Sequence, residues 1–254
     1  MEARPYILKE TSLKALQQNS FEIAVLPWGA TEAHNYHLPY GTDIYEAEYI
    51  AAEAAGLAWE KNVKLIVLPA VPFGVNTQQL DIPLTINMNP STQSFILEDV
   101  IESLEHHSIE KLVILNSHGG NNFRQMVREL QRKTDIFLCT LDWFKIAEPL
   151  KIFDEPGDHA GEMETSLLMH FNPELVRSLN EAGDGSAKKF SINAFNQGWA
   201  WAPRQWTSVT NDTGVGNPAQ ANAEKGKKYL QEISQIIADF FVELSETEIK
   251  EMYK

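Results

Sequence analysis

Four short apolar runs that alternate with helical patterns constrain the fold of this chain more than any other feature. The runs cover Glu22–Pro27, Lys64–Pro69, Lys111–Asn116 and Asp135–Asp142, and the helical patterns cover 43–60, 89–108, 122–133, 162–171 and 217–244. Nearly continuous apolar runs are typical of strands that are covered on both faces. Strands that alternate with helices form βαβ units. We therefore predict an α/β fold with a mostly parallel central sheet and helices on both faces.

Length and charge limit the organisation and the partners of the chain. Its 254 residues are 43% hydrophobic, and no linker, repeat or low-complexity tract divides them, so we expect a single domain over 1–254. The formal net charge of −14 argues against nucleic acid and anionic membrane surfaces as partners. No run of about 18 apolar residues and no signal-type N-terminus is found, so we expect a cytoplasmic protein. The single cysteine, Cys139, lies in an apolar run and is interpreted as a buried hydrophobic residue.

The segment after the first apolar run, 28–43, gathers several potential metal ligands. Glu32 and His34 are two residues apart, so in an extended segment they point to the same side. A carboxylate oxygen and an imidazole nitrogen suit a divalent transition metal such as zinc or manganese. Asp43 stands at the start of the next helix and could bridge two metals through its two oxygens. His37 could orient a metal ligand or serve as a turn residue.

Another candidate ligand, His118, directly follows the third apolar run and precedes Gly119 and Gly120. The two glycines let backbone N–H groups approach a ligand, and a helix N-terminus nearby adds positive potential. This pattern predicts a metal ligand beside a small oxyanion pocket formed at Gly119 and Gly120. The alternative is that the glycines only make a tight strand-to-helix turn.

A third polar group, 158–164, precedes the helical pattern at 162–171. His159 is a candidate proton shuttle near neutral pH, and its neighbour Asp158 is a candidate substrate contact. Glu162 or Glu164 could complete a metal shell, and the other would then stabilise the first turn of the helix. Because ligands of parallel sheets bind beyond the carboxyl ends of the strands, we expect all three polar groups to converge at one sheet edge.

The motifs together resemble the creatininase (creatinine amidohydrolase) family. The resemblance is carried by residues 26–34, 37–43, 116–121 and 159–166, in this order along the chain. It implies a three-layer α/β/α sandwich with two divalent metal ions, commonly zinc or manganese, with iron possible. It further implies that Glu32, His34, Asp43 and His118 are metal ligands, with Asp43 bridging, and that His159 is catalytic. It favours Glu164 over Glu162 as a ligand, and a homo-oligomer, often a hexamer.

The chain departs from the creatininase pattern at two places. Creatininases carry a glutamate where this chain has Gly120, and a tryptophan shortly before the catalytic histidine, where 153–157 contains none. The sequence therefore predicts a metal-dependent amidohydrolase that acts on a small cyclic amide or another non-peptide C–N bond. A formamide hydrolase, a relative that cleaves a peptide precursor, and a metal-binding homologue without activity are the alternatives. A dinucleotide-binding enzyme is rejected because no strand is followed by Gly-x-Gly-x-x-Gly.

The segment 183–216 has weak periodicity and is rich in glycine, asparagine and tryptophan. We expect loops and short strands that cover the site or form a subunit contact. Trp199, Trp201 and Trp206 could line a pocket or an interface, of which the interface is preferred.

Overall fold

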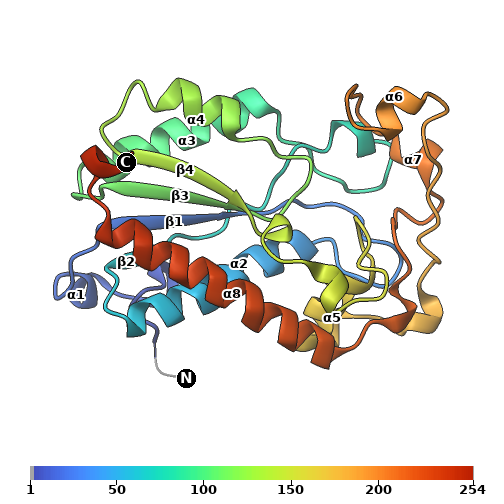
Figure 1. The fold of residues 1–254 in the computed structure, drawn as a ribbon, viewed down its shortest axis with the longest axis horizontal. Coiled ribbons are helices and arrows are strands. Elements are labelled where there is room, and N and C mark those ends of the chain that lie inside the picture. Colours follow the sequence, from blue (N-terminus) through green and yellow to red (C-terminus); the bar gives the residue numbers. More distant parts are fainter. Residues whose placement is uncertain (1–2, 254) are drawn as a thin grey trace.

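A four-stranded parallel sheet forms the centre of the protein, which was analysed as a computed structural model that describes residues 3–253 (Figure 1). The strands are β1 (Ile23–Trp28), β2 (Leu65–Val67), β3 (Lys111–Asn116) and β4 (Phe137–Asp142), in the order β2-β1-β3-β4. All pairs are parallel, with Ile23 opposite both Leu65 and Lys111. β2 is shorter than the predicted 64–69, in keeping with Pro69, which has no N–H for the ladder.

The strand order creates a topological switch point between β1 and β3. From β1 the chain crosses to β2 on one side, and it returns to β3 on the other side. The connections after β1 and after β3 therefore leave the sheet in opposite directions. Open α/β sheets bind ligands at such a point, beyond the carboxyl ends of the strands.

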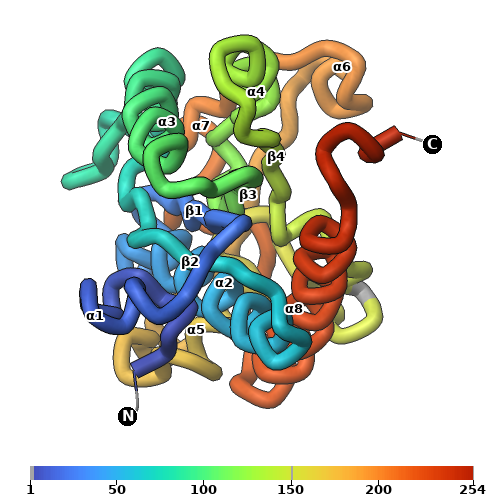
Figure 2. The backbone as a smooth tube through the Cα atoms, turned by 90° about the vertical axis from the view of Figure 1, so that its left-hand side faces the viewer, coloured from blue at the N-terminus to red at the C-terminus, as the bar shows by residue number. Residues whose placement is uncertain are grey.

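Helices cover both faces of the sheet. They are α1 (Leu13–Leu16), α2 (Thr42–Glu60), α3 (Pro90–Glu105), α4 (Arg124–Leu130), α5 (Glu162–Phe171), α6 (Asn193–Asn196), α7 (Trp206–Val209) and α8 (Ala223–Glu246). α2, α5 and α8 lie on one face, and α3 and α4 lie on the other (Figure 1). Figure 2 shows the same layers from the side. The predicted α/β/α sandwich with a parallel sheet is confirmed.

Each face of the sheet has its own apolar core. Ile23 and Val25 of β1 pack with α2 and α8, whereas Ala24, Leu26 and Trp28 pack toward α3 and α4. All six residues of β1 are buried, although successive side chains point to opposite faces. Burial on both faces explains why the β1 run is continuously apolar.

Two segments differ from the expected strands. The segment 183–216 contains the short helices α6 and α7 among loops. Among residues 3–253, one isolated β-bridge, His159 with Val215, joins it to the rest of the chain. The segment 77–87 was expected to form a short strand or hairpin. It contains the 3₁₀ helix η2 (Thr77–Gln79) and one isolated bridge, Thr31 with Ile86. Side-chain contacts, rather than strand pairing, fix both segments.

Within 3–253, no helix is both long and apolar enough to cross a membrane.

Candidate metal centre

The switch point brings the predicted polar groups together. Glu32 and His34 follow β1, His118 follows β3, and Asp43 lies in the first turn of α2. All four side chains are buried, although charged and polar residues are seldom buried without partners. Gly29 allows the loop after β1 to approach α2, because a Cβ atom at this position would lie 2.7 Å from the backbone nitrogen of Ile44.

Asp43 stands between two histidines. Its Oδ1 lies 3.1 Å from His34 Nε2, and its Oδ2 lies 3.1 Å from His118 Nδ1. The two oxygens of one carboxylate therefore face different imidazoles. This is the arrangement that a bridging ligand between two ions requires.

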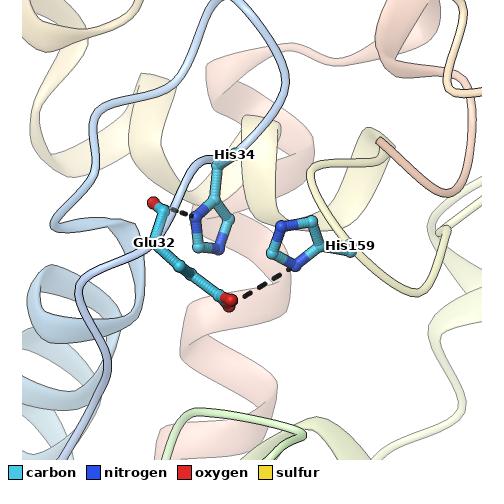
Figure 3. A group of neighbouring side chains, drawn as sticks. All are labelled: Glu32, His34 and His159. Atoms are coloured by element: carbon cyan, nitrogen blue, oxygen red, sulfur yellow. Dashed lines mark hydrogen bonds and ion pairs between the residues drawn. The ribbon is translucent and has the colours of Figure 1, made fainter. Parts of the chain in front are cut away.

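Glu32 faces His118 and a further imidazole, His159, through one of its oxygens. Its Oε1 is 3.0 Å from His118 Nδ1 and 3.8 Å from His159 Nδ1. Figure 3 shows the rings of His34 and His159 next to each other, with centroids 4.1 Å apart, and the carboxylate of Glu32 directed toward His159. The other oxygen, Oε2, accepts a hydrogen bond from Gln79 Nε2.

Backbone carbonyls fix the far side of each imidazole. His34 Nδ1 lies 3.2 Å from Glu32 O, His118 Nε2 lies 3.1 Å from Val75 O, and His159 Nε2 lies 2.9 Å from Ala33 O. A carbonyl can only accept, so in the neutral ring this nitrogen carries the proton. The lone pair of the other nitrogen then points into the centre, which is how protein carbonyls orient metal-binding histidines.

The two candidate glutamates of α5 point in different directions. Glu164 lies with His34 and Asp43, and its Oε2 accepts from the N–H of Ala160, which has a φ of 51°. Glu162 instead contacts Lys225 and accepts from the N–H of Glu155 at 2.9 Å. The structure therefore brings Glu164, and not Glu162, to the centre.

Charge interactions shift the pKa values of the buried groups. Burial opposes the charged form of His34, but the Asp43 carboxylate outweighs it and raises the pKa of His34 to about 9. The pKa of His118 is likewise raised well above its usual range against burial, mainly by Glu32. The pKa of Asp43 is lowered by His34 and by hydrogen bonds from both histidines, against burial. The carboxylates thus attract positive charge into the centre.

The pKa values of two other groups, His159 and Glu164, shift so that the neutral form is favoured. Burial and the neighbouring His34 lower the pKa of His159 to about 4, so this ring is neutral near pH 7. Burial raises the pKa of Glu164 to about 7, and the nearby Asp43 adds to the shift. His159 can therefore accept a proton at neutral pH.

The donor set fits two divalent ions. Glu32, Asp43 and His118 form one group whose ligand atoms lie within 4.8 Å of one another, and His34, Asp43 and Glu164 form a second such group. A third combination joins His159 to Glu32 and His34. Carboxylate and imidazole ligands suit zinc and manganese. Asp43 is common to the first two groups, which matches the bridging role that the resemblance implied.

The two glycines after His118 occupy different surroundings. A Cβ atom on Gly120 would lie 2.4 Å from His118 Nε2 and 2.4 Å from Val75 O, whereas one on Gly119 would meet nothing within 4 Å. Gly120 therefore packs on the edge of His118 that faces away from Glu32 and Asp43. A side chain here would displace His118, so the glutamate of creatininases does not fit this conformation. The oxyanion pocket at Gly119 and Gly120 stays a prediction.

Asp158 lies at the rim, outside the group of buried ligands. Its side chain is 59% exposed and forms an ion pair of 2.5 Å with Arg204. Arg204 stacks over Trp206, whose ring is 4.7 Å from the ring of His159. Trp206 is thus buried within the chain against the catalytic candidate, whereas Trp199 and Trp201 are 76% and 84% exposed. The interface preferred for all three tryptophans therefore does not hold for Trp206.

Sequence reasoning missed two buried residues of the centre, Gln79 and Glu46. Gln79 lies in an irregular segment with no periodicity to reveal it. Glu46 follows Asp43 by three residues on α2, so helical spacing could have placed it on the same face. Within 3–253, neither oxygen of Glu46 has a hydrogen-bond partner, and burial raises its pKa well above its usual range. His37, in contrast, contacts Thr165 Oγ1 at 2.9 Å rather than a candidate ligand.

Comparison with known proteins agrees with this geometry. The sequence model of the creatininase family, described as creatinine amidohydrolase, matches residues 8–241. The chain belongs to the creatininase family. It is 42% identical to a candidate creatinine amidohydrolase from Bacteroides fragilis, whose crystal structure superimposes with a TM-score of 0.93 and 100% coverage of both chains.

Relatives of this chain within the family are named for different activities. Creatinine amidohydrolase of Pseudomonas putida is 25% identical over 85% of this chain and 87% of the relative. The mycofactocin precursor peptide peptidase of Mycobacterium tuberculosis is 26% identical over 80% of this chain and 78% of the relative. The family is therefore hydrolytic, but membership alone does not fix the substrate. Solved structures of creatininase include a Zn–Zn form of a mutant enzyme and a manganese form.

Proposed function

We propose that this chain is a metal-dependent amidohydrolase that acts on a small cyclic amide or another non-peptide C–N bond. The observation that carries the proposal is the position of Asp43, whose two oxygens face His34 and His118 at 3.1 Å each. Glu32 and His118 would hold one ion, His34 and Glu164 would hold the other, and Asp43 would bridge them. Zinc and manganese fit these ligands, and the metal-bound forms of creatininase support the choice.

The residues around the ions have separate tasks in the reaction. Bound ions lower the pKa of a water molecule and polarise the scissile carbonyl. The water oxygen forms a bond to the carbonyl carbon, the C–N bond breaks, and a proton passes to the leaving nitrogen. His159 accepts and returns that proton, because its Nδ1 faces the centre and its lowered pKa of about 4 keeps it neutral.

The covered centre favours a small substrate. His159 is 7% exposed, and Trp206, which packs on it, is 6% exposed. An extended peptide would need these buried side chains to move before it could reach the centre. A second candidate, cleavage of a peptide precursor, is supported by the similarity to the mycofactocin precursor peptide peptidase.

A combined assay of metal content and turnover tests the proposal. The purified protein should hold two divalent ions per chain and should hydrolyse members of a panel of lactams, cyclic ureas and formamides faster than peptides. His159→Gln should retain both ions and lose about 10²–10⁴-fold in kcat, the range typical of a general acid–base residue. His107→Gln, at an exposed position just after α3, is the matched control. Protein without transition metal, together with unchanged turnover in His34→Ala, would refute the proposal.

A further inference from the structure

The two oxygens of Glu32 have different surroundings. Oε1 faces the imidazoles of His118 and His159, at 3.0 and 3.8 Å. Oε2 points away from these rings and accepts a hydrogen bond from Gln79 Nε2. A free carboxylate can rotate and bind a cation through either oxygen or both. In this protein one oxygen is already occupied.

Gln79 reaches Glu32 from a separate part of the chain. It ends η2, 47 residues beyond Glu32, and its side chain is fully buried. The amide nitrogen must face the carboxylate, because two oxygens at hydrogen-bond distance would repel each other. The donor that holds Glu32 therefore has a fixed orientation.

The contact between Gln79 and Glu32 differs from ordinary structural pairing of a buried amide. Within 3–253, Gln79 Oε1 has no hydrogen-bond partner. A buried amide that only filled the core would be expected to satisfy its acceptor as well, since an unpaired buried polar atom costs about 1–3 kcal/mol. Within 3–253, only the donor of the Gln79 amide is paired, and its partner is Glu32.

The chain directly after η2 is tied to the segment 205–207 by two hydrogen bonds to Asp81. Asp81 Oδ2 accepts hydrogen bonds from Thr207 Oγ1 at 2.5 Å and from Gln205 Nε2 at 3.2 Å. These two residues flank Trp206, which packs against His159. The position of Gln79 is therefore tied to the same segment that covers the catalytic candidate.

We propose that Gln79 is a positioning residue that holds Glu32 Oε2 and so presents Oε1 alone to the ion shared with Asp43 and His118. This inference rests on the proposed two-metal function. It predicts that Gln79 acts on one ion and leaves the other, held by His34 and Glu164, almost unchanged. Hydrogen-bond partners of metal ligands typically contribute 10–100-fold to metal affinity.

Metal titration of Gln79→Met and Gln79→Asn tests this role, with Gln78→Met as the matched control on the same 3₁₀ helix. Methionine keeps the length of the side chain without the donor, and asparagine keeps the donor but is too short to reach Glu32. Chelator competition with Zn²⁺ should show one of two ions weakened by about 10–100-fold in both variants. The visible spectrum of the Co²⁺-loaded protein should change for that ion alone.

The possible outcomes separate the inference from the proposed function. If wild type binds two ions and both Gln79 variants bind them with unchanged affinity and Co²⁺ spectrum, the role of Gln79 is refuted and the two-metal function stands. Equal weakening of both ions would also refute it, because a general loss of structure would then explain the effect. If wild type binds no ion, the proposed function fails, and the role of Gln79 fails with it.

Discussion

The two ends of β3 both bury polar groups, but they do so in different ways. At the start of the strand, Lys111 is 3% exposed and its Nζ donates to the carbonyl oxygens of Leu244 and Thr247, at 2.6 and 2.8 Å. At the other end, beyond Asn116, lie the candidate ligands and their neighbours. There, Gln79 Oε1 and both oxygens of Glu46 have no partner within 3–253.

Buried polar groups therefore have a structural role at the start of β3 and a functional role beyond its end. Lys111 satisfies the last carbonyls of α8, which no helical N–H can reach, so its burial closes the fold. Beyond β3 the chain buries acceptors that it does not satisfy, which costs stability. Such sites are where natural proteins retain locally unfavourable residues for function. The comparison predicts opposite responses to mutation at the two ends.

The largest expected effect is the loss of bound metal when Asp43, the proposed bridging ligand, is replaced. Asp43→Asn removes one charge from the residue shared by both groups of ligands, so metal content should fall from two ions to one or fewer per chain. Turnover should fall by on the order of 10³-fold, because the metals supply several kcal/mol of transition-state stabilisation. Elemental analysis and kinetics measure both, with the exposed Asp99→Asn as control. Two retained ions would remove Asp43 from the bridging position.

At the structural end, Lys111→Met should destabilise the fold by about 2 kcal/mol, because two carbonyls of the α8 terminus lose their donor. Turnover per folded molecule should not change. Urea denaturation measures the loss, and Lys250→Met, on an exposed side chain, should stay within about 0.5 kcal/mol of wild type. Unchanged stability of Lys111→Met would show that this buried lysine does not close the fold.

At the functional end, Glu46→Met should instead stabilise the metal-free protein, by about 1 kcal/mol. It replaces an unpaired buried carboxyl with an apolar side chain of similar length. Glu53→Met, on the exposed side of the same helix, controls for helix propensity. If Glu46→Met destabilises the metal-free fold as Lys111→Met does, the contrast between the two ends of β3 is wrong.

The remaining expected effect is a dependence of metal affinity on pH. The raised pKa of His34, about 9, means that protonation stabilises the metal-free fold below pH 6.5 and that this stabilisation is lost as pH rises through 9. The same proton competes with the metal. Metal affinity should therefore rise between pH 6.5 and 9, by up to about tenfold per pH unit for each proton released. Affinity that is flat over this range, measured by chelator competition, would contradict the raised pKa.

Sequence reasoning worked well for elements that repeat a simple period. The runs at 111–116 and 162–171 match β3 and α5 to the residue, because the apolar run ends at Asn116 and the helical pattern is interrupted by Asn172 and Pro173. It failed for the strand or hairpin expected at 77–87 and for the short strands expected within 183–216, where side-chain contacts such as those of Asp81 and Trp206 fix the chain. No local pattern encodes contacts between residues as far apart as Asp81 and Thr207.

The same limit applies to the centre. Glu32, His34, Asp43 and His118 could be predicted because each lies in or beside the turn after a strand, and the parallel topology brings those turns together. Gln79 could not, because only the folded chain places it against Glu32. The choice of Glu164 over Glu162 rested on the family resemblance, because both residues lie in the first turn of α5 and no sequence pattern separates them. The single domain, the homo-oligomer or hexamer and the cytoplasmic location stay predictions.

Anomalous scattering from crystals of the metal-loaded protein tests the central claim most directly. Data at the zinc and manganese edges should reveal two ions per chain, one among Glu32, Asp43 and His118 and the other among His34, Asp43 and Glu164. Asp43 should contact both ions through different oxygens. A single ion, or ions that do not contact Asp43, would contradict the two-metal centre.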